Sequence, residues 1–161
     1  MNVDEVLICS VGDLMICDSP LYASVGVGSR YKEIRLKLIE ESKSQFEGAD
    51  MVIGNLESVV HEPKNSGLQE VQMCCPKGAL QDLSDIGFGV LNIANNHIMQ
   101  HGAKAFEKTI CACRAVGLHC IGEKAKHPYY VTIKGIQFAL FSLCIHLEWY
   151  QPNNIMFHYL L

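Results

Sequence analysis

The chain has 161 residues and a formal net charge of −4, and 49% of its residues are hydrophobic. Because a chain of about 150 residues hides roughly 70% of its unfolded surface on folding, this sequence predicts one folded domain or part of one, and it excludes a disordered or fibrous protein. The acidic balance, without a run of Lys and Arg, argues against a nucleic-acid-binding surface. No stretch is long and apolar enough for us to expect a membrane segment.

The first predicted element is a buried strand over residues 6–11. This apolar run ends in Gly12 and Asp13, so it delivers a carboxylate to one edge of the predicted sheet. Residues 17–30 follow, and their composition, rich in Gly and Ser, is typical of a loop. Such a loop fits either the rim of an active site or an ordinary surface connection.

A helix and a second strand come next. Residues 31–46 carry apolar side chains at helical spacing, and Gly48 suits the end of that helix. Residues 51–53 are a second buried strand, which is followed at once by Asn55 and Glu57. This strand therefore brings an amide and a carboxylate to the same edge as the first.

The central stretch of the chain is residues 88–102. Pro76 suits the first position of a helix that ends at Gly87, and residues 90–94 then form the short apolar run of a strand covered on both faces. The polar residues 95–97 end this strand and open another helix. Ligands of open α/β sheets bind at the carboxyl ends of the strands, so the sequence predicts a site at this turn.

The last predicted elements are a helix, a short strand and a hairpin. Residues 103–116 have an amphipathic helical pattern, residues 118–121 are a short apolar run, and residues 129–133 and 136–141 form a β-hairpin with a two-residue turn. Alternation of strands and helices is typical of βαβ units. The predicted fold class is therefore α/β, with parallel-sheet βαβ units and a C-terminal β-hairpin.

The chain contains eight cysteines, and none of them belongs to a Cys-x-x-Cys pair. A zinc finger or a thioredoxin-like motif is therefore a poor interpretation. Most of the cysteines fall within apolar patterns, so we interpret them as reduced thiols that act as small hydrophobic side chains. Reduced thiols, together with the lack of a secretory signal before Val6, predict a cytoplasmic protein.

Three motifs give the sequence a resemblance to a known family. In their order and spacing they resemble the motifs of the capsule-synthesis (CapA, poly-γ-glutamate) family, a branch of the calcineurin-like metallophosphoesterases, over residues 6–142. The resemblance implies a partial calcineurin-like metallophosphoesterase sandwich, with the N-terminal part of a CapA-like domain over residues 1–145 and the tail of a truncated chain over residues 146–161. The motifs are Gly12-Asp13-Leu14-Met15, Ala49-Asp50-Met51-Val52-Ile53-Gly54-Asn55-Leu56-Glu57, and Asn92-Ile93-Ala94-Asn95-Asn96-His97 with Gly102.

The resemblance implies a role for each residue of the predicted site. Asp13, Glu57 and Asn96 correspond to metal ligands, and Glu57 stands where a carboxylate can bridge two metals. Carboxylates and amide oxygens are ligands that suit hard or borderline divalent cations. His97 corresponds to the catalytic residue that donates a proton to the leaving group or stabilises a phosphoryl oxygen. The alternatives are a turn acid for Asp13, a solvated loop acid for Glu57 and a structural imidazole for His97.

Asn55 and Asn95 are the predicted supporting residues. Asn55 can hold a carboxylate or the substrate by a hydrogen bond, which is a common role beside metals, and Asn95 can be a turn former. Gln100 departs from the family, which usually has Asp at this place. The loss of that carboxylate puts either a charge or an orienting hydrogen bond in doubt.

The activity that the resemblance implies is metal-assisted hydrolysis of a phosphoester, with divalent metal ions of the Mn, Fe or Zn type as cofactors and no side-chain nucleophile. The sequence lacks the later histidine motifs of this family, and His146 stands outside any such motif. We therefore expect metal binding by this chain to be weak or absent and the C-terminal half of the fold to be missing. Whether the chain is an enzyme stays open, because a non-catalytic polymer-assembly or binding subunit and an inactive truncated remnant fit as well. An anionic polymer or a phosphoester is the expected partner, and nucleic acid is not.

Overall fold

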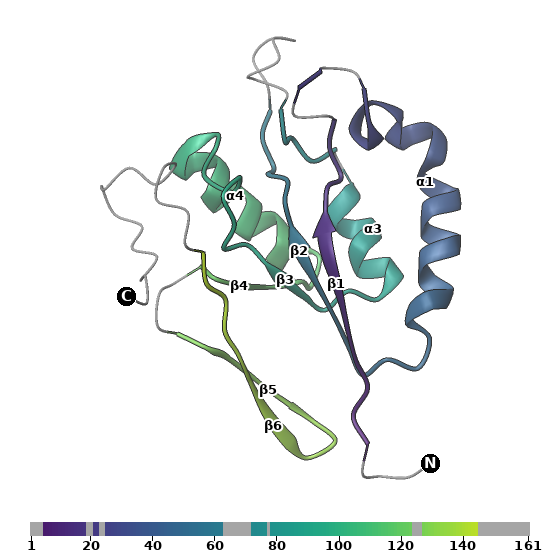
Figure 1. The fold of residues 1–161 in the computed structure, drawn as a ribbon, viewed down its shortest axis with the longest axis vertical. Coiled ribbons are helices and arrows are strands. Elements are labelled where there is room, and N and C mark those ends of the chain that lie inside the picture. Colours follow the sequence, from purple (N-terminus) through teal and green to yellow (C-terminus); the bar gives the residue numbers. More distant parts are fainter. Residues whose placement is uncertain are drawn as a thin grey trace.

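The structure is a computed structural model, and it describes residues 5–18, 21–22, 25–62, 72–76, 78–123 and 127–144. Within this part of the chain, the centre of the fold is a four-stranded parallel sheet (Figure 1). Each strand pairs in parallel with the strand that follows it in the sequence. The strands, in their order across the sheet, are β1 (Ile8–Leu14), β2 (Met51–Leu56), β3 (Val90–Asn92) and β4 (His119–Ile121).

The helices α1 (Val27–Lys43), α3 (Ala79–Ile86) and α4 (Gly102–Ala115) cover one face of this sheet, and a 3₁₀ turn, η1 (Ser44–Phe46), extends α1. Right-handed connections between successive neighbouring strands place every connecting helix on the same side. The larger hydrophobic core lies between these helices and the sheet, and it includes Val52, Leu91, Leu83, Phe106 and Ile110. The carboxyl ends of the strands consequently point to one common edge.

The opposite face of the sheet packs against an antiparallel hairpin made of β5 (Tyr129–Ile133) and β6 (Ile136–Leu140). Its two turn residues, Lys134 and Gly135, have φ values of 49° and 82°. A type I′ turn requires positive φ at both of its central residues, so the predicted two-residue turn is confirmed. Because strand side chains alternate between faces, the same strands feed a second core on this side. That core joins Met51, Val90 and Ile121 of the sheet to Tyr129, Val131, Ile133 and Leu140 of the hairpin.

The helix α3 ends at Gly87, which has a φ of 121°. The amide of Phe88 donates to the carbonyl of Leu83 over 3.0 Å, and the amide of Gly87 donates to the backbone carbonyl of Ser84. This is a Schellman ending, in which a residue with positive φ closes the helix and turns the chain back. The turn leads the chain from α3 directly into β3, which carries the central motif.

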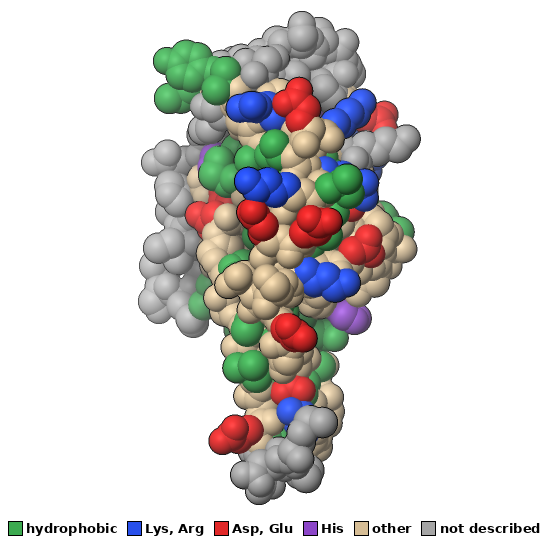
Figure 2. All heavy atoms as spheres, turned by 90° about the vertical axis from the view of Figure 1, so that its right-hand side faces the viewer, with side chains coloured by type: hydrophobic (Ala, Val, Ile, Leu, Met, Phe, Trp, Pro, Cys, Tyr) green, Lys and Arg blue, Asp and Glu red, His purple; other side chains and the backbone are tan. Residues whose placement is uncertain are grey.

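The outer surface of α1 carries interspersed acidic and basic side chains (Figure 2). Arg30 pairs with Glu33, and Lys37 pairs with Glu41, each over 3.7 Å. Exposed pairs of this kind contribute only a few tenths of a kcal/mol each, as is usual for i,i+3 and i,i+4 spacings. This surface is therefore a solvated helix face.

The predicted α/β class, with its parallel βαβ units and its hairpin, is confirmed. Two details differ. The first helical residue of α3 is Ala79 and not Pro76, because Gly78, with a φ of 90°, intervenes. The helix predicted over residues 31–46 already begins at Val27. The predicted boundary between residues 145 and 146 lies outside the described residues.

All eight cysteines are free thiols. None of the helices in the described part of the chain combines the length and apolar character that a membrane crossing requires.

Candidate functional site

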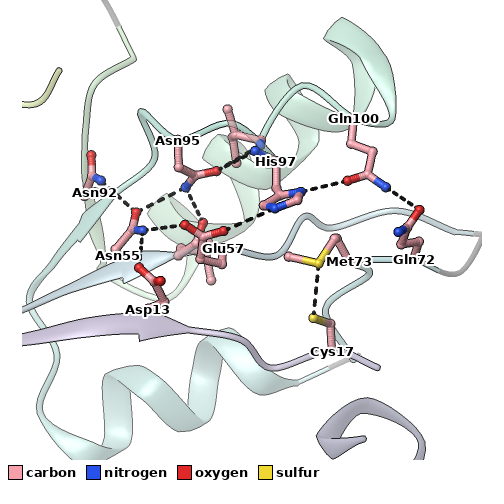
Figure 3. A network of polar contacts seen from close by, with 12 residues as sticks. Asp13, Cys17, Asn55, Glu57, Gln72, Met73, Asn92, Asn95, His97 and Gln100 are labelled. Carbon is pink, nitrogen blue, oxygen red and sulfur yellow. Dashed lines mark hydrogen bonds and ion pairs between the residues drawn. The ribbon is translucent and has the colours of Figure 1, made fainter. Parts of the chain in front are cut away.

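Five of the predicted site residues lie together where β1, β2 and β3 end, namely Asp13, Asn55, Glu57, Asn95 and His97 (Figure 3). An irregularity in the pairing of β1 with β2, between Ser10 and Asp13, places Asp13 directly opposite Asn55. Glu57 follows the last residue of β2, and His97 lies in the turn after β3. These parallel strands thus bring residues from three separate motifs together.

Asn55 joins the two acids of the site. Its Nδ2 donates to Oδ1 of Asp13 and to Oε1 of Glu57, each over 2.7 Å. One amide nitrogen reaches both carboxylates, so the two acids lie side by side, as the sequence predicted. Of the two roles expected for Asn55, the structure contains the hydrogen bond to a carboxylate.

The oxygen of Asn55 faces two further amides. Asn92 Nδ2 donates to Asn55 Oδ1 over 2.7 Å, and Asn95 Nδ2 donates to it over 3.2 Å. Asn92, the last residue of β3, stands in the quoted motif, but the sequence pattern gave it no role. Its signal was a polar residue in the middle of the apolar run predicted over residues 90–94.

Asn95 is buried and does more than form a turn. Its Nδ2 donates to the carbonyl of Leu56 over 2.8 Å, and its Oδ1 accepts the backbone amides of His97 and Ile98 over 3.1 and 3.0 Å. Asn96, the predicted amide ligand, is only half-buried. Within the described residues its side chain takes no part in this network.

His97 lies beside Glu57, with its Nε2 3.7 Å from Glu57 Oε2. Its Nδ1 is 3.0 Å from Oε1 of Gln100, whose Nε2 donates to Oε1 of Gln72 over 2.8 Å. Gln100 therefore keeps an orienting hydrogen bond to the histidine, although it carries no charge. Gln72 is a contact that the sequence gave no reason to expect.

Among the described residues, no Lys or Arg pairs with Asp13 or Glu57, and the basic group beside Glu57 is His97. Glu57 is only 8% exposed. Burial raises the pKa of its carboxyl above the usual value, and the negative charge of Asp13 raises it further, while the hydrogen bond from Asn55 and the charge of His97 act in the opposite direction. Two adjacent acids of this kind favour the binding of a positively charged group.

A family model described as "Bacterial capsule synthesis protein PGA_cap" matches residues 7–156. The chain belongs to this family. It is 29% identical over 102 residues to the "PGA biosynthesis protein CapA" of Bacillus subtilis (strain 168), a match that covers 58% of this chain and 27% of that protein. It is 28% identical over 103 residues to the "Capsule biosynthesis protein CapA" of Bacillus anthracis, with 58% of this chain and 25% of that protein covered. The matched region is thus about a quarter of the length of these curated relatives.

The donor set of this PGA_cap chain partly suits a divalent cation. The carboxylates of Asp13 and Glu57 are oxygen donors of the kind that hard cations prefer, and they lie next to each other. Asn55 is not available as an oxygen ligand, because its Oδ1 already accepts two amide donors. Among the described residues, no group of three or more His, Cys, Asp and Glu side chains is arranged to hold a metal ion.

A cleft of about 420 Å³ opens on the hairpin side of the site. Its walls include Asn55 and Asn92 from the sheet and Ser142 from the segment after β6. The hydroxyl of Ser142 donates to Oδ1 of Asn92, so the hairpin side of the fold is tied to the asparagine network. The cleft reaches the asparagine network at Asn55 and Asn92, and its lining does not include Asp13, Glu57 or His97.

Proposed function

We propose that this chain carries one part of a site for metal-assisted hydrolysis of a phosphoester in the synthesis of capsule or poly-γ-glutamate. The observation that supports it most is the pair Asp13 and Glu57, which Asn55 holds side by side and which has no Lys or Arg partner among the described residues. Family membership gives the biological setting. The names of the two relatives, which refer to PGA and capsule biosynthesis, support the choice of polymer.

Asp13 and Glu57 are the residues that would hold the metal, and the amide of Asn96 is the third proposed ligand. When bound, a divalent cation supplies a Lewis acid that activates water and neutralises charge on phosphoryl oxygens. Asn55 keeps both carboxylates aimed at the same point by donating to each of them. It thereby offsets part of the repulsion between two acids that must stay ionised to bind a cation.

His97 would supply the proton for the leaving oxygen. Its Nδ1 is hydrogen-bonded to Gln100, while its Nε2 faces Glu57 and the site. Nε2 is therefore the atom at which a proton enters and leaves. General acid catalysis of this kind contributes about 10²–10⁴-fold to a rate.

A second function, a non-catalytic polymer-assembly or binding subunit, is favoured by a different observation. The described residues contain two carboxylates and one imidazole at this edge, without a ready three-ligand metal site. A two-metal centre needs several more ligands. In that case the cleft beside Asn92 would bind polymer and the acids would not bind metal.

Metal binding separates these functions. Titration of the purified chain with Mn²⁺ and Zn²⁺ should give weak binding that Asp13→Asn and Glu57→Gln remove, because each loses an anionic ligand. Asp85→Asn is the matched control, since Asp85 is exposed and accepts a hydrogen bond only from Gln81 among the described residues. If Asp85→Asn lowers binding as much as the other two, metal binding is nonspecific and the hydrolase proposal fails.

Hydrolysis is tested with an aryl phosphodiester across the same metal series. We expect no turnover by this chain alone, because one weakly held ion polarises water only slightly. Metal-dependent turnover that Asp13→Ala abolishes would show that a further residue or a second chain completes the centre.

A further inference from the structure

We propose that Asn95 is a positioning residue that fixes Glu57 and His97 relative to each other and sets the direction of the asparagine hydrogen bonds. The inference rests on the proposed function only for its metal-binding consequence. The rest of it concerns geometry that is present without metal.

Two separate segments carry the residues that must cooperate. Glu57 follows β2, whereas His97 lies in the turn after β3. The pairing of β2 with β3 ends at Asn55 and Asn92, before Glu57 and His97 are reached. The two side chains meet in an ion pair over 3.7 Å, and a bridge beyond the strand pairing would fix the two backbones relative to each other there.

The side chain of Asn95 is that bridge. Its Nδ2 donates to the carbonyl of Leu56, the residue immediately before Glu57, over 2.8 Å. Its Oδ1 accepts the backbone amides of His97 and Ile98. One buried amide thus joins the peptide that leads into Glu57 to the peptide that carries His97 (Figure 3).

The backbone also decides which way this amide faces. A carbonyl can only accept and a peptide N–H can only donate, so the opposite orientation of Asn95 would set oxygen against oxygen and N–H against N–H. The Asn92 amide is fixed in the same way, because its Oδ1 accepts the backbone amide of Ala94 over 3.0 Å. Both side chains must then present N–H groups to their common neighbour.

The orientation of the Asn92 and Asn95 amides affects the two acids through Asn55. Its Oδ1 receives the N–H groups of Asn92 and Asn95, which leaves its own Nδ2 facing Asp13 and Glu57. A reversed Asn55 would place an oxygen against two carboxylates. Through its hydrogen bond to Asn55 Oδ1, Asn95 therefore determines the orientation of the amide donor that holds the two acids together.

The test compares Asn95→Asp with Asn95→Ala by NMR on the full, ¹⁵N-labelled chain. Asp keeps an acceptor for the His97 and Ile98 amides but puts an oxygen where Nδ2 was. We expect those two amides to keep their protection from hydrogen exchange in Asn95→Asp and to lose it in Asn95→Ala. In both variants the side-chain amide of Asn55 should shift and exchange about tenfold faster, the factor that matches the loss of one hydrogen bond of about 1.4 kcal/mol.

Asn96→Asp in the metal-free chain is the matched control, because it places the same charge in the same turn and the Asn96 side chain takes no part in the hydrogen bonds among the described residues; metal is left out because Asn96 is itself a proposed ligand. It should leave the Asn55 side-chain signals unchanged. Amides of α4 report global stability. If Asn95→Asp leaves the Asn55 signals as in the wild type, or if protection in α4 falls as much as at Asn55, Asn95 is only a structural residue and the proposal is overturned.

Metal binding gives a second readout. Residues that support a metal ligand typically contribute 10–100-fold to affinity, so Asn95→Ala should weaken Mn²⁺ binding by about this factor. Unchanged Mn²⁺ affinity, together with altered Asn55 signals, would overturn the link to the metal site. A wild-type chain that binds no Mn²⁺ would contradict the proposed function, while the Asn55 and His97 signals would still decide the positioning role.

Discussion

Two buried carboxylates, Asp82 on α3 and Glu57 at the end of β2, lie in opposite electrical surroundings. Asp82 is 2% exposed and accepts hydrogen bonds from both Arg35 and Tyr31 of α1. The Arg35 guanidinium holds the pKa of Asp82 below its usual range, and the Tyr31 hydroxyl acts in the same direction. Glu57 has the Asn55 amide, a second acid and the imidazole of His97 as neighbours instead of an Arg, and its pKa is raised.

The comparison separates an acid that links two helices from the acid that we propose as a metal ligand. Tyr31 is the buried residue of α1, and a cavity of about 310 Å³ lies among α1, β1 and α3. Because the packing between these elements leaves this cavity, the ion pair of Asp82 with Arg35 helps to hold α1 against α3. Glu57 fastens nothing comparable, and its charge costs free energy in the absence of a cation. Such locally unfavourable acids are characteristic of functional sites.

The largest effect that the comparison predicts concerns His97, the neighbour of Glu57. In a full-length family member, replacement of the corresponding histidine by Asn should lower turnover by about 10²–10⁴-fold and leave the metal bound. The free energy of unfolding should change little, because the proposed role of this side chain is proton transfer and not packing. Steady-state kinetics and metal analysis of the same preparation measure both. Loss of metal equal to that caused by removing the acid at position 57 would make His97 a ligand.

Asp82→Ala should have the largest effect on stability. It leaves the buried hydroxyl of Tyr31 without its acceptor and releases α1, so we expect the free energy of unfolding to fall by about 2–3 kcal/mol. Urea denaturation at neutral pH measures this change. Asp85→Ala, on the exposed face of the same helix, is the control and should cost well under 1 kcal/mol. Equal effects of the two substitutions would show that the ion pair does not fasten α1.

Glu57→Gln should act in the opposite direction. The substitution removes a buried charge beside Asp13 and keeps an oxygen that Asn55 can bond, so the free energy of unfolding should stay the same or rise by up to about 1 kcal/mol. Cation binding should be lost in the same variant. A loss of stability comparable to that of Asp82→Ala would contradict the distinction between the two acids.

The smallest effects are in the dependence of stability on pH. The folded state holds the proton of Glu57 more tightly than the unfolded state does, so this group lowers stability as pH rises from about 4.3 through the raised pKa. Asp82 acts with the opposite sign, since its contribution is present above its ordinary pKa of about 3.9 and is lost as pH falls through the lowered one. The urea midpoint, measured between pH 3 and pH 7, should therefore lose the Glu57-dependent fall with rising pH in Glu57→Gln. In Asp82→Ala it should lose the Asp82-dependent fall with decreasing pH. Wild-type-like profiles in both variants would contradict the two pKa directions.

The sequence was sufficient to predict the fold class and the meeting of Asp13 with Glu57. Strand periodicity locates each strand, and parallel strands joined by right-handed connections must bring their carboxyl ends to one edge. For Asn55 the sequence left two roles open, a hydrogen bond to a carboxylate or one to the substrate, and the structure contains the first. The proposed ligand and catalytic roles stay predictions, because they came from the resemblance and concern a metal and a reaction.

The tertiary structure alone decided which polar groups face each other. Asn92 and Gln72 look like an ordinary strand end and an ordinary loop residue until their hydrogen bonds to Asn55 and Gln100 are seen. Tyr31 fits the apolar pattern of its helix equally well with or without a partner for its hydroxyl. Periodicity reports which face of an element is buried, but hydrogen bonds depend on the angle and distance between side chains far apart in the sequence. For this reason the sequence revealed the acids of the site, and only the packing of β2 against β3 revealed the amide network that orients them.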